Sequence, residues 1–218
     1  ARKQDVAEVF NVPPADVAVV PGGIDSPAIS PYVLAVGAHE SFDSSGAQDW
    51  IAPWSSGGNT VRHPDVVAPG RSIMSFRVPG STLDQLYPTA RVGDRYFLGS
   101  GTSQSAAVVS GFAAAILSRN PSLTPDQVKY RLMASSWQAV ESDGSLAVSV
   151  WQQGAGRVHA LRAVSSTESA PANRGLDVAA DLAGDAHYVG PTRWDAALDQ
   201  FTLVDRPEHV WDGAFDAA

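Results

Sequence analysis

Ser100-Gly101-Thr102-Ser103-Gln104-Ser105-Ala106-Ala107-Val108-Val109-Ser110-Gly111 is the stretch that decides the fold. A glycine-rich turn leads here into an alanine-rich segment that continues to Arg119, and Pro121 prevents its continuation. The large apolar side chains of this segment are spread around most of a helical circumference: Val108, Val109, Phe112, Ile116 and Leu117. A helix that is apolar on nearly all sides is typical of a protein core. The sequence therefore predicts a buried helix over residues 103–119.

The hydroxyl group of Ser103 stands at the start of this helix. The first turn of a helix has unpaired N–H groups and the positive end of the helix dipole. An oxyanion that forms beside Ser103 would be stabilised there, with the Ser103 N–H as one donor. We expect the small residues 105–107 to keep the mouth of such a site open. The simpler interpretation is that Ser103 is the N-cap of a core helix.

The segments around this helix read as alternating strands and helices. Residues 32–38 are a near-continuous apolar run that suits a buried parallel strand, and residues 64–70 and 73–76 read as short strands. Residues 77–95 read as a long polar loop. Thr124, Pro125 and Gln127 form a strong helix start, and residues 157–164 predict a last short helix. This order predicts an α/β fold with three layers, in which helices flank a mostly parallel sheet.

The quoted string resembles the nucleophile motif of the subtilisin-like serine proteases (the subtilases), G-T-S-x-[AS]-x-P-x-[VA]-x-G. It departs from that motif at Ala107, where proline is usual, and at Val108, where histidine is frequent. Other segments resemble motifs of the family in the same order along the chain: residues 30–38, 54–57, 65–70, 120–128 and 154–160. The resemblance covers roughly residues 26–164, which would be the C-terminal half of the catalytic domain.

The resemblance implies that Ser103 is the nucleophile, supported by Gly101 and Thr102. It also implies that Asp65 is structural and supports its turn. The family supplies an oxyanion asparagine ahead of the strand at Tyr32. Asn11 lies in that region, although its neighbours do not match the motif, and a surface or turn asparagine is the alternative.

The aspartate and histidine motifs of the family, D-[TS]-G and H-G-T, do not occur in the chain. In this family both precede the serine, so the predicted fold is incomplete on its N-terminal side. The five histidines are interpreted as structural or surface residues: His39, His63, His159, His187 and His209. A serine hydroxyl is a poor nucleophile without a base. We therefore expect a missing N-terminal half, or a partner chain, to supply both groups, and this chain alone to be nearly inactive.

Three functions are compatible with these motifs. The first is a serine endopeptidase that acts on polypeptides through an acyl-enzyme. The second is a non-catalytic fragment or pseudoprotease that acts as a binding module. The third is an esterase-type hydrolase, but its G-x-S-x-G elbow differs from Gly101-Thr102-Ser103-Gln104-Ser105.

The composition of the chain limits the classes of binding partner that we expect for it. The chain has 218 residues, a formal net charge of −8 and no cysteine. An acidic surface repels phosphate backbones, so nucleic acid is not an expected partner. No run of about 18 apolar residues predicts a membrane span. The first residues lack the apolar stretch of a signal peptide, whereas the resemblance implies an extracellular or cell-envelope location.

The sequence identifies no cofactor. The resemblance allows calcium, and the candidate acids are scattered without a spaced ligand string: Asp84, Asp94, Glu141 and Asp143. Residues 1–164 are assigned to the peptidase part. Residues 165–218 are assigned to a linker, rich in serine, and a C-terminal extension of unknown role.

Overall fold

The computed structural model describes residues 24–30, 32–40, 50–58, 62–140, 147–173, 178–183, 192–195, 200–203 and 206–211. Its centre is a pair of parallel strands, β1 (Val36–Glu40) and β3 (Val66–Pro69), with Val36 opposite Val66 and Ala38 opposite Ala68. The short strand β2 (Trp50–Ile51) pairs antiparallel with the end of β1. On the far side of β3, Val67 forms a parallel bridge with Arg157. The central sheet thus pairs β1 and β3 in parallel and has one short antiparallel strand, β2, at its edge.

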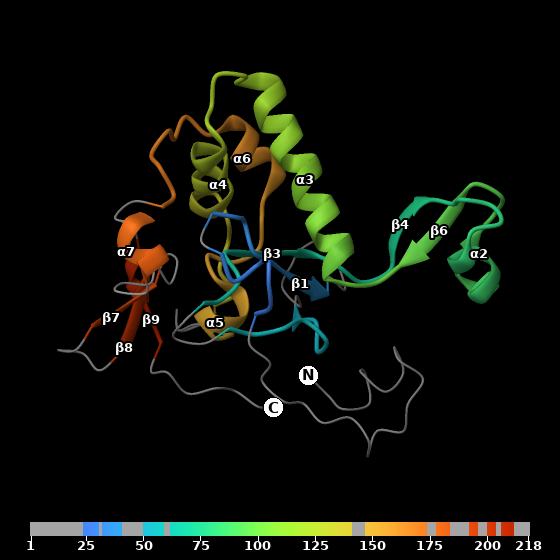
Figure 1. Ribbon diagram of the computed structural model, residues 1–218, viewed down its shortest axis with the longest axis horizontal. Helices are drawn as coiled ribbons and strands as arrows, with labels where there is room; N and C mark the ends of the chain where they lie inside the picture. The colour runs from blue at the N-terminus through green and yellow to red at the C-terminus, as the bar shows by residue number, and fades with distance from the viewer. Residues whose placement is uncertain are drawn as a thin grey trace, which may run out of the picture.

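Helix α3 (Thr102–Arg119) packs on this sheet through contacts with both β1 and β3. Helices α4 (Pro125–Ala134) and α6 (Ala160–Ser165) pack against α3 and against each other. Figure 1 shows these three helices on one side of the central strands and the short α5 (Val150–Gln153) on the other. The core is formed by apolar residues of the sheet and these helices, mainly Val66, Ala68, Val109, Ile116, Val128, Leu132 and Val158.

Local signals explain where α4 begins. The Thr124 side chain accepts a hydrogen bond from the Gln127 N–H at 3.3 Å, and the Gln127 side chain accepts one from the Thr124 N–H at 3.0 Å. This is a complete capping box with Pro125 in the first turn. The predicted start of the second helix is confirmed.

Residues 73–99 form a separate three-stranded antiparallel sheet. Its strands are β4 (Ile73–Phe76), β5 (Arg91–Val92) and β6 (Tyr96–Gly99), in the order β4-β6-β5. Between β4 and β5 lie α2 (Thr82–Leu86) and a short 3-10 helix (Pro88–Ala90). The prediction of an irregular loop over residues 77–95 was therefore wrong. Figure 1 shows this unit projecting away from the body of the molecule.

The prediction that α3 is buried on nearly all sides was also wrong for this chain. Ser105, Val109 and Ile116 are buried, whereas Leu117 is 39% exposed. The other exposed positions of the helix are Ser103, Ala106, Ala107, Ser110, Gly111, Ala114, Ala115, Ser118 and Arg119. Within the described ranges, β1, β3, α4 and α6 cover only one side of the helix. No element of the described ranges covers its other side.

The segment after α6 lies along α4. The Gln127 side chain donates to the Ser169 carbonyl at 2.8 Å, Lys129 donates to the Asn173 side chain at 3.2 Å, and Ala172 is buried in the core. Beyond it come α7 (Val178–Ala183) and an antiparallel sheet of β7 (Thr192–Asp195), β8 (Gln200–Leu203) and β9 (Arg206–Trp211). The serine-rich composition suggests a linker after residue 164. The structure shows that side chains of α4 donate hydrogen bonds to Ser169 and Asn173 of this segment.

Candidate active site

The turn that carries Ser103 connects β6 to α3. Gly101 is the N-cap of α3 and has φ 155°, a conformation that favours glycine. Thr102 is therefore the first residue of the helix and Ser103 the second, and the Ser103 side chain is exposed. Because Gly101 occupies the N-cap position, and no side chain of the described residues caps the helix, the interpretation of Ser103 as an N-cap is wrong. The hydroxyl is free to meet a substrate from solvent.

This turn is fixed to the end of β3. The Gly101 N–H donates to the Gly70 carbonyl at 2.8 Å. The Ser105 hydroxyl is fully buried and donates to the Ala68 carbonyl at 3.0 Å. Ser105 therefore ties the helix to the sheet, and the expectation that it lines the mouth of the site was wrong. Ala106 and Ala107 are exposed beside Ser103, as expected.

The first turn of α3 leaves a donor next to the Ser103 hydroxyl. The N–H groups of Gln104 and Ser105 both donate to the Gly101 carbonyl, at 3.1 and 3.3 Å. In the described part of the chain, the Ser103 N–H donates to no backbone carbonyl. It points out of the helix start, where an anion is favoured. This geometry suits an oxyanion formed beside Ser103. Thr102 is half-buried next to it, and Asn11 lies outside the described residues.

The described histidines have other roles. His159 caps α6 by accepting from the Arg162 N–H at 3.2 Å, and its ring lies 4.4 Å from that of Trp137. His63 is buried, and its Nδ1 lies 2.8 Å from the Pro64 carbonyl. His39 is a buried residue of β1. No described contact joins Ser103 to any of the three, and the side chains of His187 and His209 lie outside the described residues.

Asp65 is structural, as expected. It lies just before β3, at the end of the strand opposite to Gly70 and the Ser103 turn. Its carboxylate accepts from the Ala35 N–H at 2.7 Å and from both terminal nitrogens of Arg62 at 2.9 and 2.8 Å, while Lys129 lies 3.4 Å away. Burial alone would raise the pKa of Asp65, but the bond to Arg62 and the charge of Lys129 outweigh it and lower that pKa. The cluster joins the starts of both central strands to α4.

The acidic residues that the sequence offered for calcium do not lie together in the described part of the chain. The described residues contain no group of three or more histidine or acidic side chains placed to hold a metal ion. Asp84 binds Arg77 and Arg91, which leaves no free carboxylate there for calcium, and Asp94 is an exposed turn residue. Glu141 and Asp143 lie outside the described residues.

Comparison with known proteins places this site in a family. A family model described as "Subtilase family" matches residues 21–164. The chain belongs to the subtilase family. The subtilase match begins before the Ser26-Pro27 turn and ends within α6, so it includes β1, β3 and the Ser103 turn. Subtilases are serine proteases, and their substrates are polypeptides.

Curated relatives agree with this assignment. The chain is 40% identical to serine protease AprX of Bacillus subtilis over 145 residues, which cover 65% of this chain and 31% of AprX. It is 35% identical to mycosin-2 of Mycobacterium tuberculosis over 114 residues, which cover 52% of this chain and 19% of mycosin-2. The chain thus spans about a third or less of the length of these two relatives.

A solved subtilase shares the fold. Fervidolysin from Fervidobacterium pennivorans, a keratinolytic enzyme related to subtilisin, superimposes with a TM-score of 0.51 and 25% sequence identity. The superposition covers 66% of this chain and 20% of fervidolysin. The expected subtilisin-like α/β fold is therefore confirmed, and it is present here in part. Among the described residues, no helix is long and apolar enough to cross a membrane.

Proposed function

We propose that this chain supplies the nucleophile of a serine endopeptidase. The Ser103 hydroxyl attacks the carbonyl carbon of a peptide bond, and the amine of the leaving segment departs with a proton. The resulting ester on Ser103 is then hydrolysed by water, which releases the acid and restores the hydroxyl. A histidine accepts the Ser103 proton, and an aspartate orients that histidine. Both are supplied by a polypeptide segment that is not part of this chain.

The observation that carries the proposal is the position of Ser103. It is the exposed second residue of an 18-residue helix, and a glycine N-cap leaves the approach to it open. The Ser103 N–H is positioned to donate to the oxyanion of the tetrahedral intermediate. Loss of one such donor typically slows an acyl transfer by roughly 100- to 1000-fold. Thr102 is proposed to support this site.

The proposal also predicts that the chain is nearly inert by itself. In subtilisin, a member of the same family, removal of the triad slows turnover by about 10⁶. That figure belongs to subtilisin and sets the scale of the effect. Without a histidine beside it, the Ser103 hydroxyl retains its proton at neutral pH. A missing N-terminal half or a partner chain is proposed to complete the site.

The experiment is labelling with a fluorophosphonate probe, read by mass spectrometry. The samples are the chain alone, the chain with the polypeptide that carries the aspartate and histidine motifs, and a Ser103→Ala variant of each. Ser110→Ala is the matched control, because Ser110 is an exposed serine of the same helix. We expect labelling only in the completed protein, lost in Ser103→Ala and kept in Ser110→Ala.

Two outcomes would contradict this. Labelling of Ser103 in the chain alone would show that a base within these 218 residues reaches it. Absence of labelling in the completed, folded protein would favour the non-catalytic binding module instead.

We also propose that the protein acts outside the cell or in the cell envelope. This rests on the family resemblance. Cell fractionation with an antibody against the chain tests it, and recovery in the cytoplasmic fraction alone would contradict it.

A further inference from the structure

The unit formed by β4, α2, β5 and β6, here called the arm (residues 72–99), begins and ends beside the Ser103 turn. The Ser72 N–H donates to the Ser100 hydroxyl at 2.9 Å, and the Gly101 N–H donates to the Gly70 carbonyl at 2.8 Å. The first residue of the arm is therefore hydrogen-bonded to the turn that presents Ser103, and its last residue, Gly99, continues directly into that turn. Figure 1 shows the arm leaving the body at the end of α3 where that helix begins.

A buried carboxylate holds the arm together. Asp84 of α2 is 3% exposed and accepts hydrogen bonds from Arg77 at 2.9 Å, from Arg91 at 2.8 Å and from the Gly80 N–H at 2.9 Å. The bond to Arg77, supported by those of Gly80 and Arg91, keeps the pKa of Asp84 well below its ordinary value, although burial acts against this. The arm therefore has a charged internal cross-link that fixes α2 relative to its strands.

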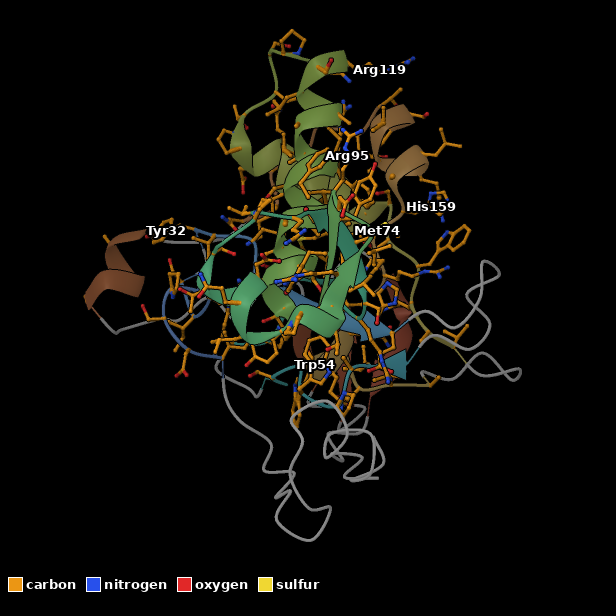
Figure 2. All side chains as sticks on the ribbon, turned by 90° about the vertical axis from the view of Figure 1, so that its right-hand side faces the viewer. Tyr32, Trp54, Met74, Arg95, Arg119 and His159 are labelled. Carbon is orange, nitrogen blue, oxygen red and sulfur yellow. The ribbon has the colours of Figure 1, made fainter. Side chains whose placement is uncertain are left out.

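One face of the arm is apolar and exposed. Side chains alternate along a strand, so Met74 and Phe76 lie on one face of β4, opposite Leu98 and Tyr96 of β6. The rings of Phe76 and Tyr96 stack with centroids 5.9 Å apart. Met74 is 57% exposed and Phe76 is 74% exposed. These four residues are called the arm face, and Figure 2 shows the arm from outside, with Met74 labelled.

The outer edge of β4 is open as well. Within the described ranges β4 pairs with β6 alone, so the N–H and C=O groups on its other side have no neighbouring strand. An extended peptide can add to such an edge through backbone hydrogen bonds, while alternate side chains contact the face beside it. Exposed apolar edge strands promote aggregation unless something covers them. A binding role accounts for an exposed Met–Phe–Tyr surface better than a purely structural one.

We propose that the arm binds an extended, apolar segment of the same polypeptide that is cut at Ser103. This proposal rests on the proposed function, because it assumes that the segment bound by the arm and the bond cut at Ser103 belong to one substrate. Gly99 pairs with Ile73 at the base of the arm, and Phe76 and Tyr96 pair three residues further out. At about 3.3 Å per residue, a peptide that lies over Ser103 reaches this aromatic pair within roughly three to six residues. The arm thus selects substrates with alternating apolar residues at that distance from the bond that is cut.

The test is a binding measurement on the full chain carrying Ser103→Ala, so that no peptide is cleaved. The probe is a fluorescent twelve-residue threonine- and serine-based peptide with leucine at alternate positions, followed by anisotropy. The arm variant is Met74→Ser with Phe76→Ser, both at exposed positions. The matched control is Leu161→Ser, because Leu161 of α6 is 71% exposed and lies outside the arm. We expect Kd to rise at least tenfold in the arm variant and to stay unchanged in the control.

Two further probes identify the mode of binding. A peptide with the leucines replaced by serine, and one with alternate backbone nitrogens methylated, should each bind at least tenfold more weakly. Equal affinity of the arm variant and the control would overturn the proposal. So would absence of peptide binding together with a concentration-dependent dimer that the arm variant abolishes, because the arm face would then bind a second copy of the chain.

Failure of this proposal is distinguishable from failure of the proposed function. A completed protein whose Ser103 reacts with the fluorophosphonate, but whose arm does not affect peptide binding, overturns the arm alone. A completed protein that binds the peptide through the arm, but never reacts at Ser103, overturns the protease assignment and leaves a peptide-binding surface.

Discussion

The Ser105 hydroxyl donates to the Ala68 carbonyl across 3.0 Å, and this bond joins the first turn of α3 to the end of β3. Ser105 is two residues after Ser103, so the bond fixes the part of the helix that presents Ser103, the proposed nucleophile. Ser105 is also fully buried, so its loss leaves a buried carbonyl without this donor. The position of Ser103 thus depends on a buried neighbour that is not accessible to solvent.

We expect Ser105→Ala to lower the free energy of unfolding by about 1–3 kcal/mol, the usual cost of an unsatisfied buried acceptor. Urea unfolding followed by circular dichroism measures it. Ser110→Ala is the control, because its hydroxyl donates to the Ala106 carbonyl at an exposed position and should cost less than about 0.5 kcal/mol. Equal losses in the two variants would show that the Ser105 bond has no special role.

Gly70 provides a second test of this junction. A Cβ at Gly70 would lie 2.5 Å from the Ser105 hydroxyl and 2.7 Å from the Ala38 Cβ. We expect Gly70→Ala to destabilise the chain by about 1–3 kcal/mol through overpacking. Gly111→Ala in α3 should instead stabilise it by about 0.5–1 kcal/mol, because nothing lies within 4 Å of a Cβ there. Differential scanning calorimetry compares the two, and a destabilising Gly111→Ala would indicate that the open side of α3 is covered in solution.

Local signals made part of this structure predictable. The capping box at Thr124, the Gly101 turn and the strand before Gly70 are each specified within a few residues, so the sequence was sufficient to predict α4, α3 and β3. The role proposed for Ser103 rests on its motif, and the family match confirms the assignment of the chain to the subtilases.

Other features depend on contacts between distant residues. Helix α2 is only five residues long and is held by Asp84 with Arg77 and Arg91, each seven residues away. The stretch before Asn173 is held by α4, some 40 residues earlier in the chain. Composition describes such segments as polar loops or linkers. The pattern of apolar residues likewise shows that α3 has several apolar sides. It does not show which of these sides pack against other elements of the chain.

Buried His63 should make stability depend on pH. Burial lowers the pKa of His63 from its ordinary value of 6.5, although the Pro64 carbonyl and the Asp65 charge act against this and the charges of Arg62 and Lys129 add to it. The unfolded chain therefore binds this proton more readily than the folded one. Stability is then full above about pH 6.5 and falls as the pH is lowered below that value.

We expect urea midpoints to fall between about pH 7 and pH 5 in the parent chain, and to fall less in His63→Gln. The lowered pKa of Asp65 acts in a different window, because its contribution is full above 3.8 and is lost only below that value. The two effects are therefore separable. A parent chain with constant midpoints from pH 7 to pH 5 would contradict the role of His63.

The cross-link at Asp84 predicts how the arm responds to the loss of one charge. Asp84→Asn keeps the shape of the side chain, but it removes the carboxylate that binds Arg77 and Arg91. The asparagine side chain has one neutral acceptor oxygen, whereas the carboxylate has two charged ones. It therefore cannot replace the hydrogen bonds to both guanidinium groups, and α2 should loosen from β4 and β5. We expect amide hydrogen exchange in residues 77–91 to accelerate at least tenfold while α3 and α4 keep their protection. Asp94→Asn is the control, because Arg77 contacts the Asp94 backbone carbonyl and that group is unchanged. Acceleration that spreads equally to α3 would mean that the arm and the body unfold together, and that Asp84 stabilises the whole fold and not the arm alone.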